Sequence, residues 1–114
     1  MKLVSIVFSF KDEEKNLPEL VNRVNKVFEE IKNWSYELIF VNDASTDKSE
    51  ELLTELQKNF PITIINMSRN FGVAPCVIAG FEQTKGDAVV YMDSDLQDPP
   101  ELIKKLITEY ENGS

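Results

Sequence analysis

Four short apolar segments alternate with four longer segments whose apolar residues recur every three or four positions. The short segments are rich in β-branched and aromatic residues, as buried strands are, and the longer ones have helical periodicity. The predicted strands are Leu3–Phe10, Tyr36–Val41, Ile62–Asn66 and Ala88–Met92. Because strands and helices alternate over short links, the sequence predicts an α/β fold. We expect a three-layer sandwich with a parallel four-stranded sheet, in the order βαβαβαβα.

The ends and buried faces of the helices are also predictable. Three residue pairs have the spacing of helix starts: Asn16 with Glu19, Asp47 with Glu50, and Asp98 with Pro99. The segment Asn33–Ser35 is predicted to close the first helix. The third helix is expected to face the core with Val73, Val77, Ile78 and Phe81. The last helix is expected to do so with Leu102, Ile103, Leu106, Ile107 and Tyr110.

Each predicted strand is followed by a polar loop. These loops are Lys11–Glu14, Asn42–Asp47, Ser68–Asn70 and Asp93–Asp98. In a parallel sheet the carboxyl ends of all strands share one edge, and ligands bind there. The four loops are therefore expected to converge on one site.

Two carboxylates and an amide follow the last predicted strand. Asp93, Asp95 and Gln97 together offer an all-oxygen donor set, which suits Mg²⁺ or Mn²⁺ carrying a phosphate. The alternative interpretation is a solvated acidic turn followed by a helix cap at Asp98. Spacing by itself leaves both interpretations open.

Other polar residues of the loops also have a functional and a structural interpretation. Arg69 is expected to contact a phosphate or to pair with an acid of the loops, and Asp43 to bind a base or ribose or to form an Asx turn. Asp47 is most simply a helix cap, with a direct ligand role as the alternative, and Gly72 permits either a tight strand-to-helix turn or a close backbone approach to a ligand. The run Asp12–Glu14 is expected to be solvated, with at most one side chain facing the site.

Composition excludes several kinds of function. The formal net charge of −8 disfavours non-specific nucleic-acid binding, and the absence of histidine disfavours zinc sites and histidine acid–base chemistry. The lone Cys76 cannot form an internal disulfide, which suits either a reducing, cytoplasmic compartment or a small packed thiol. The four glycines form neither a Gly-x-Gly-x-x-Gly motif nor a P-loop, which disfavours dinucleotide dehydrogenases and P-loop NTPases.

The loop motifs resemble those of a known family. Asp93-Ser94-Asp95 resembles the DxD signature of nucleotide-sugar glycosyltransferases with the GT-A fold, and Asn42–Asp47 resembles their DDGSTD loop. Together with Ser68–Gly72 and Asp93–Glu101, these motifs are similar to the dolichol-phosphate mannose synthase-like, polyprenyl-phosphate branch of glycosyltransferase family 2. The similarity covers essentially the whole chain and implies the Rossmann-like half of a GT-A fold.

The resemblance also implies roles for individual residues. The nucleotide-binding residues it implies are Ser9, Lys11, Glu13, Asp43, Arg69 and Asp93, with Asp43 on a uridine or guanosine base. It implies that Asp95 and Gln97 hold the divalent ion and that Asp93 and Asp95 are catalytic. Three residues depart from the family pattern, namely Ser9 for Pro, Lys11 for Tyr and Asn42 for Asp. These departures concern the base site and leave the metal site unchanged.

The implied reaction is transfer of a sugar from a UDP- or GDP-sugar to a lipid phosphate, with inversion. Members of this family carry a second half with the acceptor site, so we expect residues 1–114 to be the truncated, nucleotide-binding part of a catalytic domain and inactive alone. The parent is expected to be membrane-associated on the cytoplasmic face, and apolar surface left uncovered in this part to favour a homo-oligomer.

Two alternatives belong to other functional classes. One is a non-catalytic nucleotide- or metal-binding module. The other is a response-regulator-like signalling domain, which requires a phospho-acceptor Asp after the third strand, where this sequence has Met67–Arg69.

Overall fold

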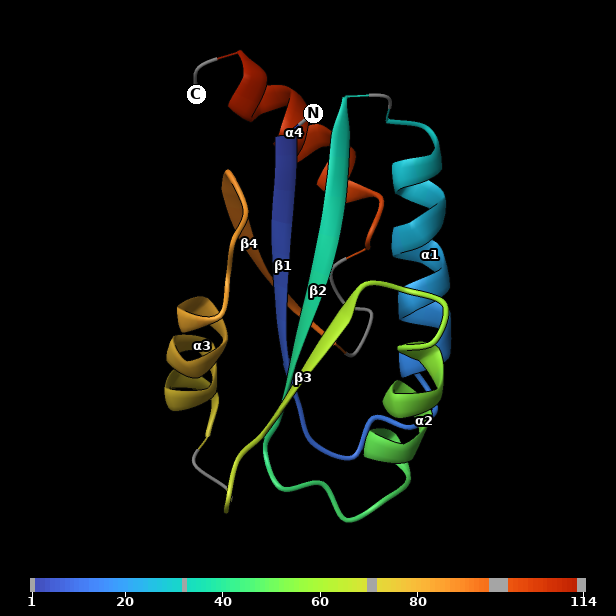
Figure 1. Ribbon diagram of the computed structural model, residues 1–114, viewed down its shortest axis with the longest axis vertical. Coiled ribbons are helices and arrows are strands. Elements are labelled where there is room, and N and C mark those ends of the chain that lie inside the picture. Colours follow the sequence, from blue (N-terminus) through green and yellow to red (C-terminus); the bar gives the residue numbers. More distant parts are fainter. Residues whose placement is uncertain (1, 32, 70–71, 95–98, 113–114) are drawn as a thin grey trace.

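The computed structural model describes residues 2–31, 33–69, 72–94 and 99–112, and it has the predicted order of elements (Figure 1). The elements are β1 (Lys2–Phe10), α1 (Leu17–Glu29), β2 (Trp34–Asn42), α2 (Ser49–Leu56), β3 (Ile62–Asn66), α3 (Val73–Glu82), β4 (Ala88–Asp93) and α4 (Leu102–Glu111). The four strands form one parallel sheet in the order β3-β2-β1-β4. The predicted α/β fold with a parallel sheet is confirmed.

Helices cover both faces of the sheet (Figure 1). Alternate residues of β1 point to opposite faces, so Ile6 belongs to one core cluster and Val7 to the other. The larger cluster joins the sheet to α1, α2 and α4. The smaller one joins it to α3 through the fully buried Cys76.

Strand register places the carboxyl ends of the strands side by side. Phe10 of β1 pairs with Asn42 of β2, and Asn42 pairs with Asn66 of β3. On the other side of β1, Ser9 pairs with Asp93, the last residue of β4. The loops that follow the strands therefore leave the sheet from a single edge.

The predicted buried face of α3 is wrong at two of its four residues; Val77 is half-buried, and the side chain of Val73 lies outside the described residues. Ile78 is 61% exposed and Phe81 is 45% exposed, whereas Cys76 is fully buried. The helix instead approaches the sheet at Gly80, where an added Cβ would lie 2.4 Å from Cγ1 of Val7. Apolar residues lie on more than one side of α3, so their spacing does not define which side meets the sheet. The side that comes closest to the sheet is the one that carries Gly80, which has no side chain.

In α4, Ile103 and Ile107 are buried as predicted, but the other predicted core residues, Leu102, Leu106 and Tyr110, are more than 40% exposed.

Three predicted element ends also differ from the structure. Trp34 begins β2 and is 3% exposed, so it does not lie in a turn after the first helix. Asn16 does not form the predicted capping box with Glu19, because its side-chain amide donates to Glu13 Oε2 at 2.7 Å. Helix α4 begins at Leu102 rather than at Pro99, after a turn in which Leu102 N–H donates to the Pro99 carbonyl. Asp98 lies outside the described residues.

In the described part of the chain, every helix falls short of the length and apolar content that crossing a bilayer requires.

Candidate functional site

The described residues predicted for the site gather at the carboxyl edge of the sheet. Ser9 pairs through the backbone with Val41 and with Asp93, and the Asp43 N–H donates to the Phe10 carbonyl at 2.9 Å. The loops after β1, β2 and β4 therefore start within two residues of one another along the sheet. This is the arrangement that the parallel alternation predicts.

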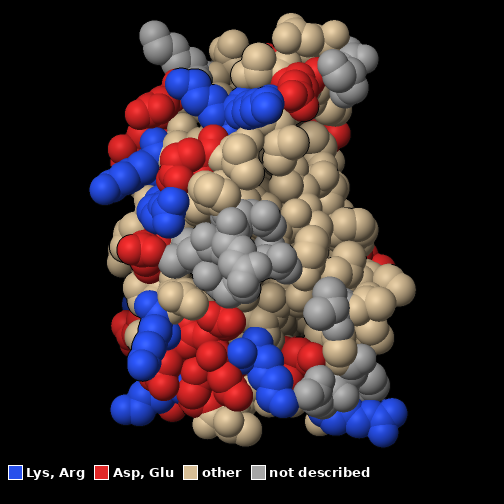
Figure 2. Space-filling view, turned by 180° about the vertical axis from the view of Figure 1, so that it is seen from behind, with Lys and Arg blue, Asp and Glu red and all other residues tan. Residues whose placement is uncertain are grey.

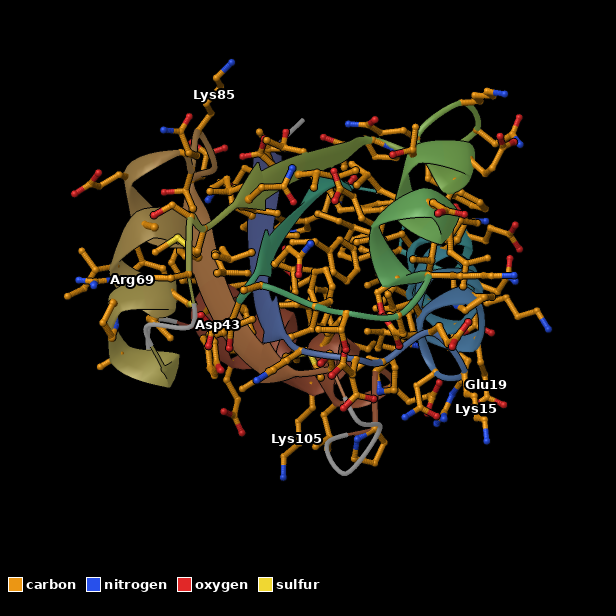
Figure 3. All side chains as sticks on the ribbon, turned by 90° about the horizontal axis from the view of Figure 1, so that it is seen from below. Lys15, Glu19, Asp43, Arg69, Lys85 and Lys105 are labelled. Carbon is orange, nitrogen blue, oxygen red and sulfur yellow. The ribbon has the colours of Figure 1, made fainter. Side chains whose placement is uncertain are left out.

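Asp43 is a buried carboxylate at this edge. It is 8% exposed, and its Oδ2 accepts a hydrogen bond from Gly72 N–H at 3.0 Å. Gly72 has a φ of +89° and immediately precedes α3, so the turn depends on a residue that tolerates the left-handed region. Figure 3 shows Asp43 and Arg69 on the α3 side of the edge. Asp43 thus connects the end of β2 to the start of α3.

Cys76 is a neighbour of this carboxylate that the sequence interpretation missed. Burial, followed by the nearby charge and hydrogen bonding of Asp43, raises the pKa of the Cys76 thiol to about 11. The thiol is therefore protonated at neutral pH and can donate to Asp43. The sequence does indicate that Cys76 lies near the site, because it comes one helical turn after Gly72, at the start of an apolar helix that follows a site loop.

The other predicted nucleotide residues lie at the end of β1, in the loop after β1 and in the segment after β3. Ser9 Oγ lies 2.8 Å from Tyr91 Oη, and Glu13 Oε2 accepts the hydrogen bond from Asn16. Lys11 and Arg69 are exposed. Contact of any of these residues with a nucleotide stays a prediction.

The predicted metal ligands lie almost wholly outside the described residues. This applies to Asp95 and Gln97 and to the side chain of Asp93, whose backbone ends β4. Within residues 2–31, 33–69, 72–94 and 99–112, no group of three or more acidic, Cys or His side chains is arranged to hold a metal ion. The metal site therefore stays a prediction.

Both segments that flank positions 95–98 are fixed to the body of the protein. Before them, Ser94 Oγ donates to the Ser9 carbonyl at 3.2 Å. After them, Arg23 of α1 forms a two-point ion pair with Glu101, with an Nη2–Oε1 distance of 2.6 Å. Hydrogen bonding to the Arg23 guanidinium lowers the pKa of Glu101. These contacts fix the described residues on either side of positions 95–98 relative to β1 and α1.

The side chains of the run Asp12–Glu14 are exposed or half-buried, but its three backbone N–H groups are held by side chains of the loop after β2 and of Ser49, the first residue of α2. The acceptors are Ser45 Oγ at 3.0 Å, Ser49 Oγ at 3.0 Å and Asp47 Oδ2 at 3.1 Å. These bonds hold the loop after β1 against the loop after β2.

Asp47 has a structural role near the start of α2. Its Oδ1 accepts the N–H of Ser49 at 2.9 Å and the hydroxyl of Ser49 at 2.6 Å. Its predicted partner Glu50 instead accepts a hydrogen bond from Asn66 Nδ2 at 3.1 Å. Burial raises the pKa of Asp47, but the hydrogen bonds from Ser49 and Glu14 outweigh it, so the net shift is downward.

The surroundings of the edge are acidic. Figure 2 shows acidic side chains gathered toward the lower end of the molecule, which is the end at which the strands terminate in Figure 1. A free anion is repelled by such a surface, whereas an anion that carries a divalent cation is repelled less.

Residues 5–114 match the family model described as Glycosyl transferase family 2. The chain is 41% identical over 112 residues to the undecaprenyl-phosphate 4-deoxy-4-formamido-L-arabinose transferase of Pseudomonas fluorescens, covering 96% of this chain and 33% of that protein. It is 38% identical over 111 residues to the dolichol-phosphate mannosyltransferase of Pyrococcus furiosus, covering 97% and 31%. The chain thus spans about a third of the length of these relatives.

Solved structures share the fold of this chain. S. aureus TarS 1–349 superimposes with a TM-score of 0.79 at 22% identity, covering 98% of this chain and 33% of that one. Mannosyltransferase PcManGT of Pyrobaculum calidifontis, solved with GDP-Man and Mn²⁺, superimposes with a TM-score of 0.75 at 17% identity, covering 91% and 31%. These likenesses support the GT-A fold, and the match over residues 5–114 shows that the chain belongs to glycosyl transferase family 2.

Proposed function

We propose that residues 1–114 bind the nucleotide of a sugar donor and form the N-terminal part of a glycosyltransferase domain. The buried Asp43 carboxylate carries this proposal, because it lies at the edge where the loops of a family 2 chain converge. In the protein that contains this part, the reaction is transfer of a sugar from a nucleoside diphosphate to a polyprenyl phosphate, with inversion. The names of the relatives, an undecaprenyl-phosphate and a dolichol-phosphate transferase, support this acceptor.

Asp43 is proposed to read the base. An ionised carboxylate only accepts hydrogen bonds, so it complements a base that presents an N–H on its Watson–Crick edge. Uracil and guanine present a ring N–H there, whereas cytosine presents an unprotonated ring nitrogen, which is an acceptor, beside its exocyclic amino group. Asp43 is therefore proposed to favour UDP and GDP over CDP, and the remainder of the nucleotide site is proposed to be lined by Ser9, Lys11, Glu13 and Arg69.

The diphosphate is proposed to bind through a divalent ion, Mg²⁺ or Mn²⁺, held by Asp95 and Gln97 beside Asp93. Carboxylate and amide oxygens suit either ion, and PcManGT, which shares the fold, was solved with Mn²⁺. Such an ion supplies neutralisation of the charge that develops on a leaving diphosphate. Since a phosphate acceptor is already anionic, it needs little help from a general base, so leaving-group stabilisation dominates the catalysis.

In this proposal the acceptor is a membrane lipid, so the reaction takes place at a membrane surface. The nucleotide-sugar donor is the reason to propose the cytoplasmic face of that membrane.

The nucleotide-binding role can be tested on the chain itself. We expect UDP or GDP to bind weakly with Mn²⁺ and less without it, because the chain carries a net charge of −8 and repels a free diphosphate.

The test is a calorimetric or NMR titration with UDP, GDP and CDP, each with Mn²⁺ and with EDTA. Asp43→Asn is the matched variant, because it keeps the shape of the side chain but removes its acceptor-only character. Absence of a metal-dependent signal at millimolar UDP and GDP would contradict a preformed site. Equal binding of CDP, or unchanged binding by Asp43→Asn, would contradict the role of Asp43. Sugar transfer is assayed separately, on a protein that contains this chain and its continuation, with a polyprenyl phosphate as acceptor.

A further inference from the structure

Two loops at the edge exchange hydrogen bonds in both directions. The loop after β1 donates its backbone N–H groups to side chains of the loop after β2 and of Ser49, the first residue of α2, as described above. In return, Asp12 of the first loop accepts hydrogen bonds from the second. Its Oδ1 lies 2.6 Å from Thr46 N and 3.2 Å from Asp47 N. We call the bonds between residues 12–14 and 45–49 the loop clasp.

The backbone of Asp12 is held in an unusual conformation. Its φ is +56°, in the left-handed region that Asn and Asp tolerate better than other non-glycine residues. This conformation turns the Asp12 N–H toward Ser45 Oγ while the carboxylate reaches Thr46. Position 12 therefore requires both a tolerated positive φ and a side-chain acceptor.

One oxygen of Asp12 makes most of these bonds. Oδ1 accepts from Thr46 N, from Thr46 Oγ1 at 3.3 Å and from Asp47 N, whereas Oδ2 has one long contact of 3.4 Å to Thr46 Oγ1. A carboxamide offers one such oxygen, and Asn tolerates the same φ. The geometry thus depends on an acceptor at this position and not on a negative charge.

The clasp connects residues on both sides of the proposed nucleotide site. Asp12 lies between Lys11 and Glu13, and the loop that it binds starts at Asp43, whose carboxylate is already tied to Gly72. We propose that Asp12 is a positioning residue for the donor nucleotide, holding the Lys11–Glu13 segment at a set distance from Asp43. This role rests on the proposed function, whereas the clasp itself does not.

Three substitutions separate the requirements of position 12. Asp12→Asn keeps the acceptor and the tolerated φ. Asp12→Gly keeps the tolerated φ and removes the acceptor, and Asp12→Ala removes both. The readouts are amide hydrogen exchange at Thr46 and Asp47 by NMR, thermal unfolding, and titration with UDP and GDP in Mn²⁺ at a temperature where every variant is folded.

We expect Asp12→Asn to bind nucleotide within about twofold of the parent chain and to keep both amides protected. Because a misplacement of about 1 Å in a site costs up to about 100-fold, we expect roughly tenfold weaker binding in Asp12→Gly, with faster exchange at both amides. Asp12→Ala should be weaker still and less stable. Rescue by Asn separates a positioning role from a charge or metal-ligand role.

Nucleotide binding by Asp12→Gly equal to that of the parent chain would overturn the proposal, as would a loss in Asp12→Asn as large as in Asp12→Gly. If the parent chain itself binds neither nucleotide, the proposed function fails and the donor-binding role of Asp12 fails with it. Amide exchange in the same variants then decides whether Asp12 joins the two loops.

Discussion

The close contact of α3 with the sheet at Gly80 leads to a quantitative prediction. A Cβ at this position would lie 2.4 Å from Cγ1 of Val7 and 3.1 Å from Cγ2 of Val41, and both valines are fully buried. The first distance is at least 1 Å shorter than the ~3.5–4.0 Å of a favourable carbon contact. Gly80→Ala must therefore displace the helix or force a valine from its rotamer.

The expected loss follows from two opposing terms. Overpacking a core typically costs about 1–3 kcal/mol, and replacing Gly by Ala inside a helix returns about 1 kcal/mol. Since the overlap is large and Val7 lies in a central strand, we take the upper part of the first range. The net loss in the free energy of unfolding is then about 1–2 kcal/mol, or roughly 4–8 °C in Tm.

Urea and thermal unfolding, followed by circular dichroism, measure this loss. The matched control is Val7→Ala, which removes the clashing methyl group. Each substitution destabilises by itself, but adding Gly80→Ala to Val7→Ala should cost little or nothing, so the two are coupled. Gly80→Ala that unfolds at or above the parent Tm would refute the reasoning, as would a cost that is unchanged in the Val7→Ala background.

Three further predictions follow from the site. Asp43→Ala removes the charged acceptor of the Gly72 N–H group and should lower the free energy of unfolding, measured by urea titration, by about 1.5–3 kcal/mol. A loss below about 0.5 kcal/mol, which is typical of a neutral surface substitution, would show that the bond is dispensable. The Cys76 thiol is fully buried with a raised pKa, so it should react with iodoacetamide at pH 8 far more slowly in the folded chain than in urea. Equal labelling of the folded and unfolded chain would contradict this burial. Because the pKa of Cys76 is about 11 in the folded chain and 9.0 in the unfolded chain, the contribution of the thiol to stability is complete below pH 9 and declines toward pH 11. The pKa of Asp47 is lowered in the folded state, so its contribution to stability is present above the ordinary value of 3.8 and is lost as the pH falls through the folded value. The loss of stability at acidic pH should therefore be less steep in Asp47→Asn. An unchanged pH dependence in this variant would count against the contacts of Asp47 with Ser49.

The type and order of the elements could be predicted because they depend on local patterns. An apolar strand such as Ile62–Asn66 is bounded by polar or turn-forming residues, and the structure keeps these bounds. The convergence of loops at one edge follows from parallel pairing, which requires no knowledge of side-chain contacts. For this reason Asp43 could be placed at the end of β2 before its partners were known.

The contacts of the loops could not be predicted in the same way. Asn16 has the spacing of a capping box, but its side-chain amide donates to Glu13, because the backbone turn closed by the Asn16 N–H and the Glu13 carbonyl brings the two residues together. The sequence shows Asp12 as part of a charged run, and nothing in its neighbours indicates that Thr46 lies beside it. Each of these partners is more than 30 residues away or depends on a backbone turn, and so has no local signature.

The sequence by itself determined that this chain forms a parallel α/β sheet, that its polar loops share one edge, and that its motifs are those of glycosyl transferase family 2. These features are written in short-range periodicity and in residue order. Only the tertiary structure decided which side of α3 meets the sheet, because that depends on the approach of Gly80 to Val7 across layers. It also decided the loop clasp at Asp12, since those hydrogen bonds exist only once β1 and β2 lie side by side.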